Sequence, residues 1–296
     1  MAARLTFTQR WLPVATVLLA VLALWYAGAV GLNEAGAIER VLPNSHPNGD
    51  WTLTDLVNIT WNMERPVLPA PHQVAADLYS SLVDWPLDSP RNLLYHAAVT
   101  AQSTLVGFVL GTLLGMVLAA AIVHSRTLDR ALLPWIVASQ TVPVLAIAPI
   151  VLVILGSLGF SGVAPKATIA MYLCFFPVTV AMVQGLRAPQ KLETELMHTY
   201  AASQLQAFWL LRMPSALPYL FPSLRVAIAA GLVGAMVAEL PTGAQAGLGA
   251  RLLTGSYYGN TVGIWSALVL SALLGLVLTL AVAALERLVL RRGKAA

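Results

Sequence analysis

The sequence has little charge and almost no cysteine. Of its 296 residues, 10% are Asp, Glu, Lys or Arg, against roughly 25% in an ordinary soluble domain. So little charge cannot keep the surface of a globule of this size dispersed in water, which argues against a soluble enzyme. The single cysteine, Cys174, excludes a scaffold held by disulfides. The chain also lacks the G-x-x-x-x-G-K-[ST] phosphate loop, so nothing in it indicates that it hydrolyses ATP itself.

Apolar residues are what the sequence has in excess. Hydrophobic residues make up 58% of the chain and the mean hydropathy is +0.76, which excludes disorder and indicates a polytopic membrane protein. A helix needs about 20 apolar residues to cross the hydrocarbon core. Five runs without charged residues are that long. A sixth run reaches this length if Arg225 lies at a membrane interface, where its side chain can extend to water. The predicted fold is all-α, with six transmembrane helices near residues 11–32, 97–123, 136–157, 167–186, 222–241 and 263–285. Pro134, Pro143 and Pro149 should interrupt the third.

The distribution of basic residues predicts the orientation. Six spans place both termini on one side, which would carry twelve Lys and Arg against five on the other. Both termini are therefore expected in the cytoplasm. No basic stripe carries interleaved aromatic residues, so no nucleic-acid partner is expected. Residues 1–33 are interpreted as an uncleaved transmembrane anchor, because the apolar stretch is longer than the 7–15 residues of a cleavable signal. Cleavage, favoured by small residues at 27–29, is the alternative.

The loops divide the rest of the chain. Residues 34–95 form a predicted external loop with eight acidic and three basic residues. Its proline-rich first part should be irregular, while apolar residues at helical spacing in 73–83 predict a short interfacial helix, with a plain solvated loop as the alternative. Residues 96–290 form the predicted core. Within it, Gly107, Gly111 and Gly115 lie on one helix face and allow close packing, either inside the subunit or at a dimer seam.

The cytoplasmic loop 187–221 is the most specific feature. Residues 193–211 are expected to be helical, and Pro214 and Pro218 are expected to end that helix. The small residues 201–203 leave room for another surface to come close, and three apolar residues follow at 208–210. An apolar knob facing the cytosol indicates a protein partner. The alternative is that this loop folds back onto its own helices.

These residues resemble a known family. Glu195-Leu-Met-His-Thr-Tyr-Ala-Ala-Ser203, then Gln206-Ala-Phe208 and Pro214-Ser-Ala-Leu-Pro218, resembles the EAA motif of the permease subunits of binding-protein-dependent ABC importers. Residues 68–71, the glycine ladder, residues 142–149 and Glu239 with Gly247-Leu-Gly249 resemble the nitrate/sulfonate/taurine branch. The resemblance covers about residues 66–290. Leu196-Met197 replaces the family's Ala-Ala. Ala201 stands where the family has glycine, which puts the local bend in question.

The resemblance implies a function and a set of partners. It implies a type I ABC importer permease-like fold in the bacterial cytoplasmic (inner) membrane, a homodimer, two separate ATP-binding subunits and an external solute-binding protein. The permease itself is then a transport subunit and not an enzyme, with no cofactor or metal of its own and ATP bound on the partner. The implied ATPase-coupling residues are Glu195, Ala201, Ala202, Ser203, Gln206, Phe208 and Pro214.

Polar residues inside the predicted spans are candidates for the transport pathway, because they are costly in lipid. They are Gln140, Thr141, Gln184 and Glu239. Glu239 is the one acidic residue within those limits, and no Lys or Arg lies well inside them. That composition favours a neutral or cationic solute, such as a pyrimidine or another nitrogen heterocycle, over the anions of the branch. For Glu239 the alternative is an interfacial residue that contacts water or Arg251.

Two other classes of function remain open from the residues alone. A secondary transporter usually carries several coupling charges inside its spans, and here Glu239 is the one available. A membrane scaffold would not need a broken third span. The long cytoplasmic loop therefore favours the importer subunit. No spacing of His, Cys or Asp indicates a metal site, and the five histidines are scattered.

Overall fold

The computed structural model describes residues 7–45, 49–241 and 246–292, and every regular element within those ranges is helical. The all-α prediction is therefore confirmed. Five helices in these ranges are long and apolar enough to cross a membrane, and one bent pair can form a sixth crossing. The five are α1 (Phe7–Gly36), α5 (Leu93–His124), α8 (Val163–Leu186), α11 (Met213–Glu239) and α13 (Thr261–Arg292). Each contains or closely overlaps one of the predicted spans.

The third predicted span is the bent pair. Helices α6 (Arg126–Ser139) and α7 (Val144–Ser157) meet at 102° across a short break. Pro143 is the N-cap of α7 in an extended conformation, and a proline disfavours helix at the residue before it. Pro134 and Pro149 lie inside their helices and do not interrupt them, so that part of the prediction is wrong. Only the proline that coincides with a turn breaks the chain's helical course.

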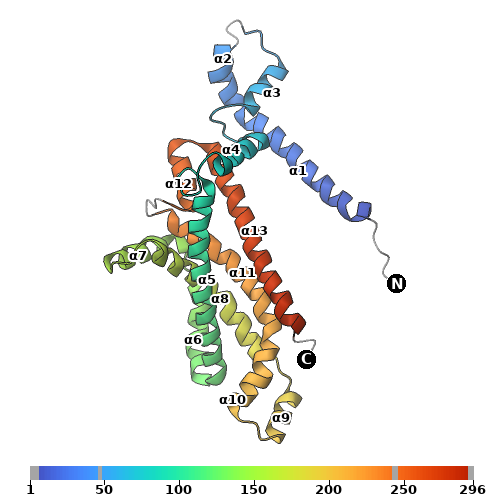
Figure 1. The fold of residues 1–296 in the computed structure, drawn as a ribbon, viewed down its shortest axis with the longest axis vertical. Helices are drawn as coiled ribbons and strands as arrows, with labels where there is room; N and C mark the ends of the chain where they lie inside the picture. The colour runs from blue at the N-terminus through green and yellow to red at the C-terminus, as the bar shows by residue number, and fades with distance from the viewer. Residues whose placement is uncertain (1–6, 46–48, 242–245, 293–296) are drawn as a thin grey trace. The chain divides into compact units, whose positions relative to one another are not determined.

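The chain divides into two compact units, which are described separately. Unit 1 comprises residues 1–93 and 251–269, and unit 2 comprises residues 94–250 and 270–296. Unit 1 contains α1, η1 (Ala37–Val41, a π-helix), α2 (Leu42–Ser45), α3 (Leu53–Trp61) and α4 (Pro71–Val83) (Figure 1). Its second stretch holds most of α12 (Leu248–Tyr258) and the start of α13. The helix predicted at 73–83 is confirmed as α4. The stretch before it is not irregular as expected, since helix continues to Ser45 and α3 follows. Thr52 begins α3 with a capping box to Asp55.

One buried asparagine ties unit 1 together. Asn33 of α1 is 1% exposed. Its Nδ2 donates to the carbonyls of Thr60 (3.2 Å) and Leu68 (2.8 Å), and its Oδ1 accepts from the N–H groups of Val67 and Leu68. A buried amide satisfied on both sides fixes the chain that surrounds it. Asn33 therefore anchors the segment that follows α3 to the C-terminal half of α1.

In unit 2, α8 packs between α5 and α11 at short range. A Cβ added to Gly107 would stand 2.5 Å from Ala170 Cβ, and one added to Gly111 would stand 2.6 Å from Cys174 Cβ. A Cβ on Gly231 of α11 would stand 2.6 Å from Cys174 Sγ, so α5 and α11 both approach α8 closely at this residue. Only glycine permits backbones to approach this closely. The glycine ladder is thus used for packing within the subunit, which was one of the two predicted roles.

Candidate functional site

The segment between α8 and α11 forms a helix–turn–helix at one end of unit 2 (Figure 1). It comprises α9 (Lys191–Thr199), α10 (Gln204–Ala207) and the π-helix η2 (Phe208–Arg212), and is called the α9–η2 segment below. The single helix predicted at 193–211 is therefore wrong, because a turn interrupts it. The expectation that Pro214 and Pro218 end the helix is also wrong. Residues Gln204–Glu239 run on as one helical span, and the wide π-helical turn just before Pro214 leaves space for the ring.

The turn is a Schellman motif closed by an alanine. Ala201 has φ of +52°, in the left-handed region. Its N–H donates to His198 O (2.9 Å), and the N–H of Ala202 donates to Met197 O (3.0 Å), which is the paired bonding of that motif. The bend that the family forms with glycine is thus present here with alanine. The alanine Cβ costs about 1–2 kcal/mol in this conformation relative to glycine.

Ser203 and Gln206 have a structural role in the same turn. The Ser203 hydroxyl accepts from the N–H of Gln206, and the Gln206 side chain accepts from the N–H of Ser203 at 2.8 Å. This reciprocal capping box starts α10 immediately after the Schellman turn ends α9. Two of the predicted coupling residues therefore set the angle between the two helices.

The α9–η2 segment exposes an apolar surface. None of the residues of α9, α10 or η2 is buried. Six large apolar side chains are each more than half exposed: Leu192, Leu196, Tyr200, Leu205, Trp209 and Leu210. The first three recur every fourth residue along α9 and its C-cap residue, Tyr200, and so share one face. Phe208 instead folds back, packing against the core of unit 2 with its ring 5.2 Å from that of His124. Most of this surface has no partner within the described part of the chain.

Glu239 ends α11 in a closed polar cluster at the opposite end of unit 2. Its side chain is fully buried. The carboxylate accepts from the Thr100 hydroxyl (3.0 Å) and from the N–H of Gly249 (2.8 Å), and it pairs with Lys166 Nζ at 3.4 Å. Lys166 also donates to Ala246 O at 2.8 Å. The predicted alternative partner was Arg251, but the structure pairs Glu239 with Lys166.

The loop that follows α11 is held on this cluster through its backbone. The N–H of Gly247 donates to His96 Nδ1 (3.0 Å), and the N–H of Leu248 donates to Thr100 Oγ1 (2.9 Å). A Cβ on Gly247, whose φ is +130°, would overlap the Glu239 carboxylate, and one on Gly249 would overlap Met236 O. Both glycines that resembled the family pattern are therefore required by close contact. The geometry favours a structural role for Glu239 over a place on an open pathway.

Two charged pairs were missed from the sequence. Lys166 lies inside α8, 7% exposed, although the predicted span began one residue later. Glu286, one residue beyond the last predicted span, pairs with Arg225 of α11. Arg225 is thus in contact with α13 rather than simply placed at an interface. Because Lys166 compensates the charge of Glu239, the composition argument for a cationic or neutral solute loses its basis.

The other candidate pathway residues do not gather around Glu239. Gln140 and Thr141 lie together, exposed, at the break between α6 and α7. Gln184 is exposed near the C-terminal end of α8, about 27 Å along the helix from Lys166 at 1.5 Å per residue. The structure brings two of the four residues together and leaves the other two apart.

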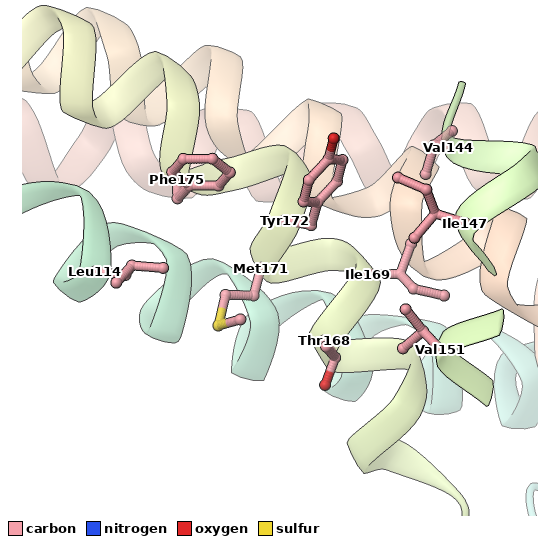
Figure 2. A pocket seen from close by; sticks show the side chains of 9 residues that line it. All are labelled: Leu114, Val144, Ile147, Val151, Thr168, Ile169, Met171, Tyr172 and Phe175. Carbon is pink, nitrogen blue, oxygen red and sulfur yellow. The ribbon is translucent and has the colours of Figure 1, made fainter. Parts of the chain in front are cut away.

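A cavity of about 170 Å³ opens beside this break, between α5, α7 and α8. Figure 2 shows Met171, Tyr172 and Phe175 of α8 lining it, with side chains of α7 at one end and Leu114 of α5 at the other. Its two hydroxyl groups are already bonded, Thr168 to Ala164 O and Tyr172 to Ser139 O. The lining is therefore apolar and aromatic, and it includes no charged side chain.

Comparison with known proteins identifies the architecture. Residues 111–292 match the binding-protein-dependent transport system inner membrane component family. The chain belongs to this family of ABC importer permeases. It is a multi-pass membrane protein and a transport subunit. The matched residues include the α9–η2 segment and Glu239, whereas α1 to α4 lie outside them.

Several relatives of this permease match over most of their length. It is 30% identical to the formylaminopyrimidine transport permease of Halalkalibacterium halodurans over 79% of this chain and 92% of the relative. It is 31% identical to the riboflavin transport system permease of Chloroflexus aurantiacus, over 76% of this chain and 80% of the relative. The taurine transport system permease of Escherichia coli is 24% identical to it, over 80% of this chain and 86% of the relative.

Proposed function

We propose that this permease is the membrane subunit of an ATP-driven importer, in which two copies of the chain contact two ATP-binding subunits. The observation that carries the proposal is the exposed α9–η2 segment, a capped helix–turn–helix with six exposed apolar side chains. An exposed apolar surface of this kind marks a site of contact with another protein. The chain's lack of a phosphate loop agrees with ATP hydrolysis on that partner.

The helix that leaves this segment provides a mechanical connection. Gln204–Glu239 is a continuous span of 36 residues, about 54 Å long at 1.5 Å per residue. It begins in the turn at Ser203 and ends in the Glu239 cluster, and α11 packs along α8 between these points. A displacement of the turn by the ATP-binding subunit would therefore move the far end of α11 as part of one rigid element. In this way ATP-driven motion would reach the loop that Glu239 holds.

The orientation and the first helix belong to the same proposal. The twelve-to-five distribution of basic residues supports cytoplasmic termini, with the α9–η2 segment inside and α3 and α4 outside. The first helix would remain attached after insertion. Trp25 Nε1 donates to Pro69 O (3.0 Å) and Asn33 anchors the following chain, so cleavage at 27–29 would remove one of the contacts that hold the external segment.

For the solute, we propose a nitrogen heterocycle delivered by an external binding protein. Support comes from the relatives named for formylaminopyrimidine and riboflavin, which are more similar than the one named for taurine. The apolar, aromatic lining of the cavity beside Tyr172 suits a flat uncharged ring and offers no side-chain charge to an anion. A taurine- or sulfonate-type anion is the alternative, supported by the more distant relatives.

Competition for uptake tests the solute. Cells that express the complete transporter take up a labelled aminopyrimidine, and a hundredfold excess of unlabelled solute is added. Unlabelled aminopyrimidine or riboflavin should abolish uptake of the label, and taurine or an alkanesulfonate should not. Uptake of labelled taurine, with no uptake of the heterocycle, would instead assign the permease to the anion importers.

A pair of substitutions at Ala202 tests the coupling surface. Ala202 is half-buried in the turn. Ala202→Asp should leave insertion and yield unchanged but stop uptake and co-purification of the ATP-binding subunit, because an unpaired charge would be buried in that contact. Ala202→Ser, similar in size but neutral, should retain both. Normal uptake by Ala202→Asp at equal expression would remove the turn from the contact.

A further inference from the structure

Unit 1 contains a cavity of about 580 Å³ next to the C-terminal end of α1. Arg40 of η1 and Arg65, which follows α3, both line it, although they are 25 residues apart in the sequence. Asn58 and Asn62 contribute further polar groups from the end of α3, and Ile59 and Met63 provide an apolar side. The cavity is thus amphipathic, with two guanidinium groups and two amides beside apolar side chains.

The charges in this cavity are unusual for their surroundings. Residues 34–95 carry eight acidic side chains and three basic ones, and two of those three line the cavity. The third, Arg91, stacks on the ring of Trp85 at 4.5 Å. Within the described ranges, no ion pair includes Arg40 or Arg65. Glu64 also lines the cavity but lies beyond ion-pair distance of either arginine, so both can receive an anion from outside the chain.

The length of α1 places the cavity near the membrane surface. The apolar span Leu12–Val41 has 30 residues, about 45 Å of helix against a hydrocarbon core of about 30 Å. The run of apolar residues ends at Leu32, and Arg40 follows about 12 Å further along. An arginine side chain at that height can reach the phosphate layer.

We propose that this cavity binds a phosphate-type oxyanion that is part of an amphipathic molecule. Arg40 and Arg65 would donate to the phosphate oxygens, for which the planar guanidinium is well suited. Asn62 Nδ2 already donates to Asn58 O at 2.8 Å, so the Asn58 amide and the remaining groups of the Asn62 amide would bind a neighbouring hydroxyl or ester group. Ile59 and Met63 would contact the apolar part. Two sources present this chemistry at a membrane surface: the headgroup of an anionic phospholipid, and a free organic or inorganic phosphate. The residues that line this cavity all belong to unit 1, and none of them is among the proposed solute-pathway or coupling residues.

Lipid retention by the full chain tests the proposal. The purified protein is exchanged into phosphatidylcholine nanodiscs containing a small fraction of phosphatidylglycerol, extracted gently, and analysed by native mass spectrometry. The variant Arg40→Ala/Arg65→Ala is compared with Arg91→Ala, which removes the third arginine of the same segment and serves as the matched control. The thermal unfolding midpoint of each variant is measured without anion and at concentrations of inorganic phosphate or glycerol 1-phosphate that rise in tenfold steps. An increase in the midpoint reports binding of the free anion.

Wild type and Arg91→Ala should both retain phosphatidylglycerol over phosphatidylcholine, and the double variant should lose that preference by at least about tenfold. A lipid preference that excess phosphate does not displace identifies the headgroup as the source. Stabilisation by glycerol 1-phosphate without a lipid preference, again absent from the double variant, identifies the free anion. Equal behaviour of wild type and the double variant with every probe would overturn the site. A double variant that unfolds is replaced by Arg40→Gln/Arg65→Gln, which keeps hydrogen-bonding groups at both positions.

Discussion

Removing Lys166 should destabilise the protein far more than removing Lys166 and Glu239 together. The variant Lys166→Met keeps an unbranched apolar stem, one atom shorter than that of lysine, and leaves the Glu239 carboxylate fully buried. That carboxylate then keeps the Thr100 hydroxyl and the N–H of Gly249 but loses its counter-charge. Breaking a buried ion pair on one side costs about 3–5 kcal/mol.

The double variant Lys166→Met/Glu239→Gln should recover most of that loss. The glutamine carbonyl can still accept from the Thr100 hydroxyl and from the N–H of Gly249, so both of these donors keep their acceptor. A neutral hydrogen-bonded replacement of a buried pair is often close to wild type in stability. The coupling energy between the two positions should therefore be at least about 2 kcal/mol.

Thermal unfolding in detergent, followed by the monodisperse fraction on size exclusion, measures this cycle. Lys166→Met should lower the midpoint by roughly 10 °C, with Glu239→Gln alone intermediate and the double variant closer to wild type. Transport by the surviving double variant provides a second result: near-normal uptake is expected if the cluster is structural. A double variant as unstable as the sum of the singles would refute the ion pair. A stable double variant with no uptake would return Glu239 to the solute pathway.

Three further predictions address the turn, the helix packing and the orientation. Ala201→Gly should slow hydrogen exchange of the α9 amides several-fold, since it relieves about 1 kcal/mol at a positive φ; unchanged exchange would contradict a left-handed residue there. Gly111→Leu should abolish recovery of folded protein because its Cβ would meet α8 at 2.6 Å, whereas Gly156→Leu, with open space around it, should fold normally. A reporter active only in the cytoplasm should work when fused after Ala296 and fail near Asn48, and activity at Asn48 would reverse the orientation.

The features that could be predicted from sequence depend on a repeating pattern. Long apolar runs predicted the five spans, and the spacing of the glycines predicted close packing on one helix face. The turn at Ala201 has no such pattern, because alanine is the best helix former and favours a continuous helix. Only the resemblance to a family with glycine at that place indicated a bend. Asn33 likewise has no local signal, since its four bonds are to residues 27 to 35 positions away.

The missed charges have a common cause, which lies in how the spans were defined. A span that is defined as a charge-free run ends before the first charged residue, so a charge that pairs across helices can fall just outside it. Lys166 and Glu286 were each one residue beyond a predicted limit, and both are paired with a residue of α11. An oppositely charged partner lowers the free-energy cost of burying a charged side chain inside a membrane protein. Opposite charges at the ends of neighbouring apolar runs should therefore be read as candidate pairs that fix helix packing, before an isolated acidic residue such as Glu239 is assigned to a solute pathway.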